Sequence, residues 1–197
     1  MIYDSYVLKS KYKDYSNINQ KIAIDCKNGV FQRVKRGLYS TNVAADGPVL
    51  ANVCQSPSYL SFEYALSVYG LIPEYVSVYT SAVYRKKNNR SYRTKGAKFE
   101  YLRIPDDAFP YGITYMENEE GIRYKIASKE KALMDLIYTK YPVRSIKDIK
   151  MMLFDDLRID EEEFRKLDFP FIEEVAPFYR SNSINSLVKF VNEEMKR

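Results

Sequence analysis

The chain has 197 residues, of which 46% are hydrophobic, 29% charged and 15% aromatic, and its net charge is +5. This composition is that of a globular protein of one or two small domains, and it excludes a disordered tail or a fibre. No apolar run approaches the roughly 20 residues of a membrane span, and the first residues lack a basic-then-apolar signal pattern. We therefore expect a cytoplasmic protein with no membrane partner.

Three absences narrow the chemistry. The chain contains no histidine, which removes the usual general base, every triad that uses histidine and every histidine metal site. Its two cysteines, Cys26 and Cys54, form no CxxC motif, and both are interpreted as small core residues. Neither a P-loop nor a GxGxxG loop occurs. We expect no catalytic residue, no cofactor and no metal.

Charge is distributed unevenly along the chain. Residues 1–45 contain eight basic residues (Lys and Arg) and three acidic residues. Residues 46–104 contain eight basic and four acidic residues. Residues 105–197 contain fifteen basic and nineteen acidic residues. A basic first half favours contact with a polyanion such as nucleic acid, and the alternative is that the charge serves solubility alone.

The sequence pattern of the first 45 residues predicts two helices. A short helix is expected over about residues 2–12, with Tyr6 and Val7 among its apolar positions. Ser16 can cap a second helix that runs to about Lys27 and ends at Asn28-Gly29. The buried stripe of this second helix is expected to consist of Ile18, Ile22 and Cys26.

A basic hairpin is predicted to follow the second helix. Apolar and polar residues alternate from Val30 to Lys35, and a turn at Gly37 leads into Leu38 and Tyr39. Helix, turn, helix and hairpin is the plan of a winged helix-turn-helix, which places its second helix in the major groove. The predicted contacts to bases and phosphates are Asn17, Asn19, Gln20, Lys21, Arg33, Lys35 and Arg36. The alternative is a small structural domain with a solvated basic hairpin.

Residues 46–197 predict a mixed α/β domain, after a linker over residues 42–48. A helix capped by Ser56, with Pro57 in its first turn, is expected to end at Gly70 and to be buried. Strand-rich stretches follow at residues 75–84, 98–104, 111–116 and 121–127. A long basic loop, residues 85–95, is predicted as a second phosphate-contacting surface, and the alternative is a mobile solvated loop. Its proposed contacts are Arg85, Lys86, Lys87 and Arg90.

The last third is predicted to be helical. Ser128 and Ser145 can each cap a helix, Asp160 and Glu163 form a capping-box pattern, and Ser183 can start a terminal helix. The expected fold class is therefore α+β: a short winged helix-turn-helix (1–45), then a mixed α/β domain (46–197) with a helical C-terminal third.

Several motifs of the chain resemble those of one known family. They span about residues 30–140 and comprise Lys35–Tyr39, Leu50–Val53, Ser56–Glu74, Thr80–Ser81, Phe99–Tyr101 and Ala127–Leu136. Together they resemble the AbiEi family, the antitoxins of type IV toxin–antitoxin systems of abortive infection. The N-terminal region is shorter than the usual winged helix, and residues 85–95 match no motif.

The resemblance implies a role in phage defence. An N-terminal winged helix would bind the promoter of its own operon and act as a transcriptional regulator that represses it. The C-terminal domain would carry the antitoxin activity against a nucleotidyltransferase toxin encoded nearby, a functional partner that need not form a tight complex with it.

Most motif residues also have an expected structural role, such as helix capping. Lys131 and Asp135 are spaced i, i+4 and are expected to form an exposed salt bridge. The motif residues left as candidates for surface function are Ser58, Ser61, Glu63, Lys129 and Asp135.

The sequence leaves two other functional classes as alternatives. A nucleotidyltransferase would need a Gly-Ser loop and paired aspartates, but no Gly-Ser occurs and the pairs Asp106-Asp107 and Asp155-Asp156 are adjacent, so their side chains point apart. A nucleic-acid-processing enzyme is therefore the less favoured alternative. The other is a protein-interaction module without DNA binding, whose acidic second half meets a basic partner. The sequence favours a DNA-binding antitoxin that is not an enzyme.

Overall fold

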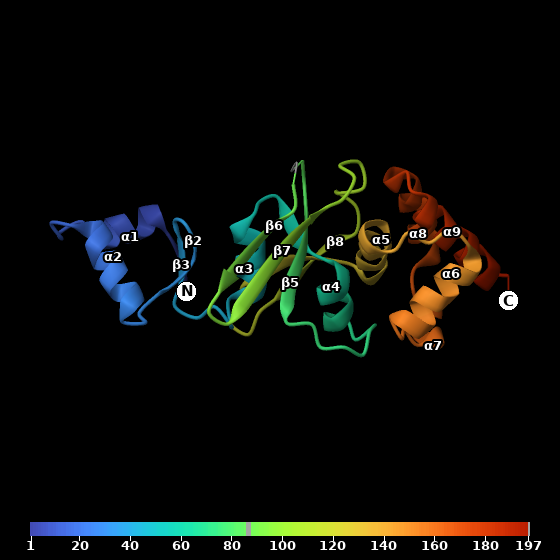
Figure 1. Cartoon of the computed structure of the whole chain (residues 1–197), viewed down its shortest axis with the longest axis horizontal. Coiled ribbons are helices and arrows are strands. Elements are labelled where there is room, and N and C mark those ends of the chain that lie inside the picture. Colours follow the sequence, from blue (N-terminus) through green and yellow to red (C-terminus); the bar gives the residue numbers. More distant parts are fainter. Residues whose placement is uncertain (86–87, 197) are drawn as a thin grey trace.

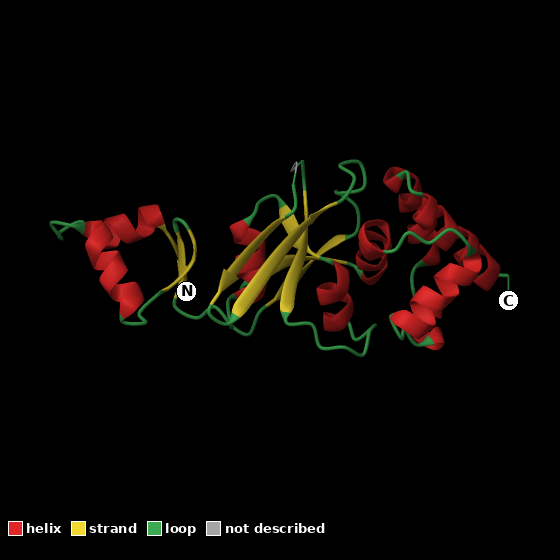
Figure 2. Cartoon of the chain, viewed as in Figure 1, coloured by secondary structure: helices red, strands yellow, loops and turns green. Residues whose placement is uncertain are grey.

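The computed structural model describes residues 1–85 and 88–196 and shows an α+β protein. Figure 1 shows an elongated molecule with a small N-terminal unit at one end, a mixed sheet in the middle and a group of helices at the other end. Figure 2 shows the small sheet in the N-terminal unit, the larger sheet in the centre, and helices in every part of the molecule.

The N-terminal unit combines a small antiparallel sheet with two helices. Its chain order is β1 (Ile2–Asp4), α1 (Ser5–Lys11), α2 (Ile18–Lys27), β2 (Gln32–Lys35) and β3 (Leu38–Ser40). The sheet has the order β1-β3-β2, so the first strand lies beside the last one. The predicted first helix was therefore wrong at its start, because residues 2–4 pair with residues 38–40 and form a strand.

The central sheet has the strand order β6-β7-β5-β4-β9-β8 and mixes parallel and antiparallel pairs. Its strands are β4 (Ser58–Leu60), β5 (Val78–Val83), β6 (Arg90–Thr94), β7 (Ala97–Arg103), β8 (Ile113–Glu117) and β9 (Arg123–Ala127). The predicted long basic loop is in part this sheet, since Arg90–Thr94 pairs antiparallel with β7 as an edge strand.

Helices pack on both faces of the central sheet. Adjacent residues of a strand point to opposite faces. In β4 the Ser58 hydroxyl contacts the carbonyl of Ala51 in α3 (Gly47–Cys54) at 3.5 Å. The Tyr59 hydroxyl donates to Asp135 in α5 (Lys129–Lys140) at 3.0 Å. Thus α3 lies against one face and α5 against the other, between the sheet and the C-terminal helices (Figure 1).

The predicted helix over residues 56–70 was wrong in its N-terminal part. Ser58–Leu60 is strand β4, and the helix α4 (Phe62–Val68) begins after Ser61 instead of Ser56. Burial of Phe62, Ala65 and Leu66 confirms that this helix lies against the core, although Val68 is 42% exposed. The segment predicted as a linker contains the start of α3, whose N-cap is Asp46.

The C-terminal third is helical, as predicted. Ser128 accepts a hydrogen bond from the Lys131 amide at the start of α5, and Ser145 and Asp148 form a capping box. Asp160 also caps its helix. The elements after α5 are α6 (Ile146–Lys150), a π-helical turn (Met151–Asp156), α7 (Glu161–Arg165), α8 (Phe169–Val175), a 3-10 turn (Ala176–Tyr179) and α9 (Asn182–Glu194). Their aromatic core includes Phe164 stacked on Phe190, with ring centroids 5.4 Å apart.

Two clusters of buried apolar side chains hold the fold together. The smaller one, which we call the N-terminal core, consists of Leu8, Tyr12, Ile22 and Phe31. Val34, Leu38 and Val43 belong instead to the large cluster of the central sheet and C-terminal helices. The predicted domain boundary at residue 45 stays a prediction, and the hairpin before it packs against the second unit.

No helix of the described residues is both long enough and apolar enough to cross a membrane.

Candidate nucleic-acid interface and buried charged cluster

Helices α1 and α2 are fixed to each other by a buried carboxylate. Asp25 of α2 accepts hydrogen bonds from the Tyr12 hydroxyl at 2.6 Å and from the Lys21 ammonium at 2.7 Å. The bond from Lys21, then that from Tyr12, holds the pKa of Asp25 below its usual value. Burial and the adjacent carboxylate raise the pKa of Tyr12 to about 12. The predicted DNA contact Lys21 is therefore engaged within the N-terminal unit.

The start of α2 also differs from the prediction. Asn17, rather than Ser16, is the N-cap, and its side chain accepts a hydrogen bond from the Gln20 amide at 3.0 Å. The side-chain oxygen of Asn17 thus satisfies a free N–H of the helix end.

The exposed face of α2 carries a mixed stripe of side chains. Asn19 and Gln20, both predicted contacts, lie there. Ile24 and Lys27 follow Gln20 at i+4 and i+7, on the same face, and both are exposed. These two residues complete the exposed stripe, and their spacing from Gln20 is sufficient to predict it from the sequence.

A groove of about 600 Å³ separates α2 from the hairpin. Its cationic side chains are Lys9 of α1, Arg33 of β2 and Arg36 of the hairpin turn, and no carboxylate lines it. Within the part of the chain that the structure describes, none of these three cations forms an ion pair. Lys9 was not predicted as a site residue, because its position in the sequence gave no sign that it faces the hairpin.

Lys35, the remaining predicted contact of the hairpin, points to the second unit instead. Its ammonium donates to the carbonyl of Cys54 at the end of α3 and lies 5.8 Å from the ring centroid of Tyr92 in β6. This side chain links the hairpin to the central sheet, and it is half-buried.

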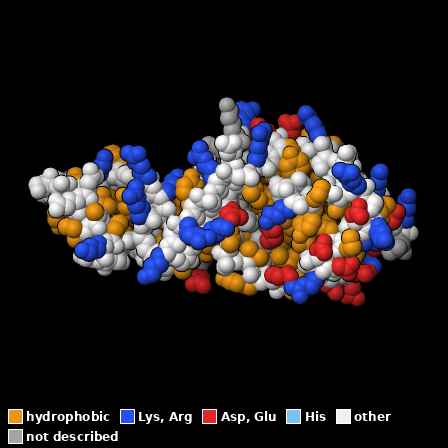
Figure 3. Space-filling view, viewed as in Figure 1, with side chains coloured by type: hydrophobic (Ala, Val, Ile, Leu, Met, Phe, Trp, Pro, Cys, Tyr) orange, Lys and Arg blue, Asp and Glu red, His pale blue; other side chains and the backbone are white. Residues whose placement is uncertain are grey.

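Basic side chains continue over the β5–β6 segment. Arg90 and Arg93 are exposed on the edge strand β6. Arg85 is exposed too, but its guanidinium lies 3.8 Å from Asp106. The predicted contacts Lys86 and Lys87 lie outside the described residues. In Figure 3 Lys and Arg side chains are visible on the N-terminal unit and on the sheet, and others lie over the C-terminal helices.

The motif residues expected at the surface divide into two groups. Ser58, Ser61 and Asp135 are buried, so the expectation of surface function was wrong for these three. Glu63 is half-buried and paired with Lys140 at 2.5 Å, and Lys129 is half-exposed at the start of α5.

Lys131 and Asp135 form a buried charged cluster, not the exposed salt bridge that their spacing predicts. Both side chains are 0% exposed, and their charged atoms are 2.5 Å apart. Asp135 also accepts bonds from the hydroxyls of Tyr59 at 3.0 Å, Ser61 at 2.7 Å and Tyr179 at 2.5 Å. The Lys131 ammonium donates to the Tyr179 hydroxyl at 2.6 Å. We call these five residues the Lys131 cluster; it joins β4, α5 and the turn before α9.

Burial shifts the pKa values of the titratable side chains in the Lys131 cluster. Burial lowers the pKa of Lys131, and the charge of Asp135 opposes this shift. Burial, reinforced by the same carboxylate, raises the pKa of Tyr59 and of Tyr179 well above 10. With no atom of the ion pair at the surface, the arrangement can fix three elements together but cannot contact a ligand in this conformation.

Across residues 1–85 and 88–196, no group of three or more Cys, Asp and Glu side chains could hold a metal ion. Comparison with models of known protein families finds no match, and comparison with curated proteins finds none either.

Proposed function

We propose that this protein is a DNA-binding transcriptional repressor that serves as the antitoxin of a type IV toxin–antitoxin pair. The observation that carries the DNA-binding half is the groove between α2 and the hairpin. Three cations and Asn19 of α2 line it, and no carboxylate does; Gln20, the next residue of α2, is exposed but does not line the groove. Such a groove attracts phosphates, and Asn and Gln side chains can form hydrogen bonds with adenine edges.

The order of elements supports the same proposal. Two helices are followed by an antiparallel hairpin, and the initial strand β1 extends the hairpin into a small sheet. A winged helix-turn-helix has a helix pair and a hairpin in this order, with its second helix in the major groove. In this interpretation α2 is the recognition helix, and the β2–β3 hairpin, which carries Arg33, is the wing.

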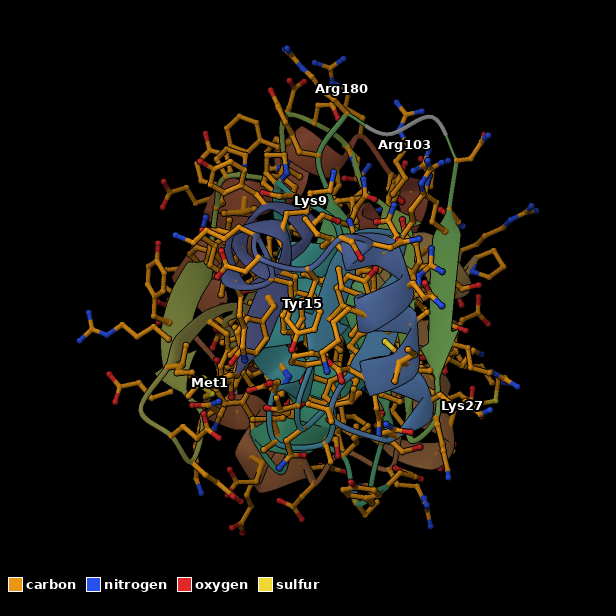
Figure 4. All side chains as sticks on the ribbon, turned by 90° about the vertical axis from the view of Figure 1, so that its left-hand side faces the viewer. Met1, Lys9, Tyr15, Lys27, Arg103 and Arg180 are labelled. Atoms are coloured by element: carbon orange, nitrogen blue, oxygen red, sulfur yellow. The ribbon has the colours of Figure 1, made fainter. Side chains whose placement is uncertain are left out.

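Further basic residues extend the proposed interface along the molecule. Figure 4, viewed from the N-terminal end, shows Lys9 and Arg103 in the upper half of the view; Arg180, also there, is paired with Asp107 and adds no free charge. Arg90 and Arg93 add two exposed cations on β6. A duplex that contacts both the N-terminal groove and the edge strand β6 would have more of its phosphates neutralised than one that contacts the N-terminal unit alone.

The test is a promoter-binding titration at several salt concentrations. Arg33→Ala with Arg36→Ala is expected to weaken binding and to reduce the salt slope by roughly one unit for each lost phosphate contact. The matched control is Lys147→Ala with Lys196→Ala, which removes two exposed cations of the C-terminal helical part. Unchanged affinity in the first variant, or an equal loss in both, would show that the hairpin is not the wing.

The edge strand needs its own variant. Arg90→Ser with Arg93→Ser is expected to reduce binding to random duplex while the fold remains intact, because both side chains are exposed. If random-duplex affinity stays the same, the interface is confined to the N-terminal unit.

The antitoxin half of the proposal rests on the AbiEi resemblance, whose motif residues form much of the second unit. The test is growth rescue in cells that express a nucleotidyltransferase encoded beside this chain. Failure to rescue, together with intact promoter binding, would leave a DNA-binding regulator. Rescue without any promoter binding would instead favour a protein-interaction module.

A further inference from the structure

A second basic groove lies at the end of the molecule opposite the N-terminal unit. It has a volume of about 580 Å³ and is lined by Arg144, Asn182, Asn185, Ser186 and Lys189. Arg144 belongs to the segment between α5 and α6, and the other four residues lie on α9 (Figure 1). We call it the α9 groove.

The spacing of the α9 residues explains the groove. Asn182, Asn185 and Lys189 are separated by three and four positions, so they share one face of the helix with Ser186. The opposite face buries Ile184, Leu187 and Val191 in the core. The polar face is thus held rigidly, and the guanidinium of Arg144 meets it from a neighbouring segment.

The α9 groove is positively charged, whereas the part of the chain around it is acidic. Residues 105–197 have more acidic than basic residues, and several exposed cations there pair with carboxylates, such as Arg158 with Glu74 and Arg180 with Asp107. Arg144 and Lys189 form no ion pair within the described residues, and no carboxylate lines the groove. Two unpaired cations that face one groove can attract an anion and donate charge-assisted hydrogen bonds to it.

We propose that the α9 groove binds a nucleoside polyphosphate. Arg144 and Lys189 supply the charges for the phosphates. Asn182 and Asn185 supply carboxamides, which can both donate and accept hydrogen bonds to a base or a sugar. The volume is within the range of small-molecule sites and exceeds what a single phosphate needs. This site is separate from the proposed DNA interface and does not depend on it.

The experiment is a calorimetric titration of the full chain with ATP, pyrophosphate and adenosine. ATP and pyrophosphate are expected to bind, and adenosine to bind at least about tenfold more weakly than ATP, because it lacks the charges that Arg144 and Lys189 meet. Arg144→Ala and Lys189→Ala should each weaken ATP binding by about tenfold. Asn185→Ala should weaken ATP binding and leave pyrophosphate binding unchanged.

Lys147→Ala is the matched control, since it removes an exposed cation that does not line the groove. An equal effect of this control would overturn the proposal in favour of general attraction of anions. No binding of ATP at millimolar concentration, or equal affinity for adenosine and ATP, would also overturn it. Promoter affinity should be unchanged in Arg144→Ala and Lys189→Ala; a loss of duplex binding without a loss of ATP binding would assign the groove to nucleic acid instead.

Discussion

The Lys131 cluster permits a quantitative test of what joins the C-terminal helices to the sheet. Lys131→Met keeps the length and apolar stem of the side chain but leaves the Asp135 carboxylate buried without its cation. Asp135→Asn keeps the shape of the side chain but leaves the Lys131 ammonium without its counter-ion. Breaking a buried pair in this way costs about 3–5 kcal/mol, a large part of the roughly 5–15 kcal/mol that stabilises a typical domain.

The double variant should cost less than the sum of the two single variants. With both charges gone, the Asn carbonyl oxygen can still accept from Tyr59 and Ser61, and its amide can donate to the Tyr179 hydroxyl oxygen. The buried hydroxyls then keep partners, and no charge remains without a counter-ion. We therefore expect a coupling energy of at least about 2 kcal/mol between the two substitutions.

The assay is urea unfolding of the wild type, the two single variants and the double variant, monitored by circular dichroism at one pH. The single variants should shift the midpoint strongly to lower urea, and the double variant should recover part of the loss. Free energies that add, with no recovery in the double variant, would refute the reasoning, because they would mean that each charge is stabilised independently of the other.

Further predictions concern backbone, pH and domain boundary. Gly112→Ala should destabilise more than Gly121→Ala, by roughly 1–3 kcal/mol in thermal unfolding, because both have positive φ but only at Gly112 would a Cβ approach Lys131, at 2.7 Å. Free phenols titrate near 10, and burial raises the pKa of Tyr69 to about 12. The contribution of this shift to stability should be complete below pH 10 and should be lost as the pH rises towards 12. Tyr69→Phe should make that fall in stability shallower, as measured by urea titrations across this pH range. A fragment of residues 46–197 should fold, lose promoter repression and still rescue growth, with a melting temperature below that of the full chain because the hairpin side chains leave the large core; a folded fragment that cannot rescue would contradict the assignment of antitoxin activity to this part.

The C-terminal helices could be predicted from sequence because their determinants are local. A serine cap followed by apolar residues at helical spacing is contained within one or two turns, and Ser128 and Ser145 both cap as expected. The strand Ser58–Leu60 could not be found in this way. It forms because β5 and β9, which lie later in the chain, pair with it on both sides, and this overrides the helical signal of Ser56 and Pro57.

The candidate sites show the same limit. The i, i+4 spacing of Lys131 and Asp135 correctly predicted their contact, but spacing alone does not reveal burial. That burial depends on Tyr59, 76 positions before Asp135, and on Tyr179, 44 positions after it. Likewise, Lys21 and Lys35 have the same charge as Arg33 in the sequence, and only the structure shows that partners hold both lysines.

The small size of the N-terminal core has a consequence for local stability. Leu8, Tyr12, Ile22 and Phe31 are the buried apolar residues that hold α1 and α2, whereas α5 lies within the large cluster. Segments with few buried contacts open at a lower free energy than the whole protein. Amide hydrogens of α2 should therefore exchange with deuterium sooner than those of α5, and a bound duplex should slow their exchange because it ligates only the closed form.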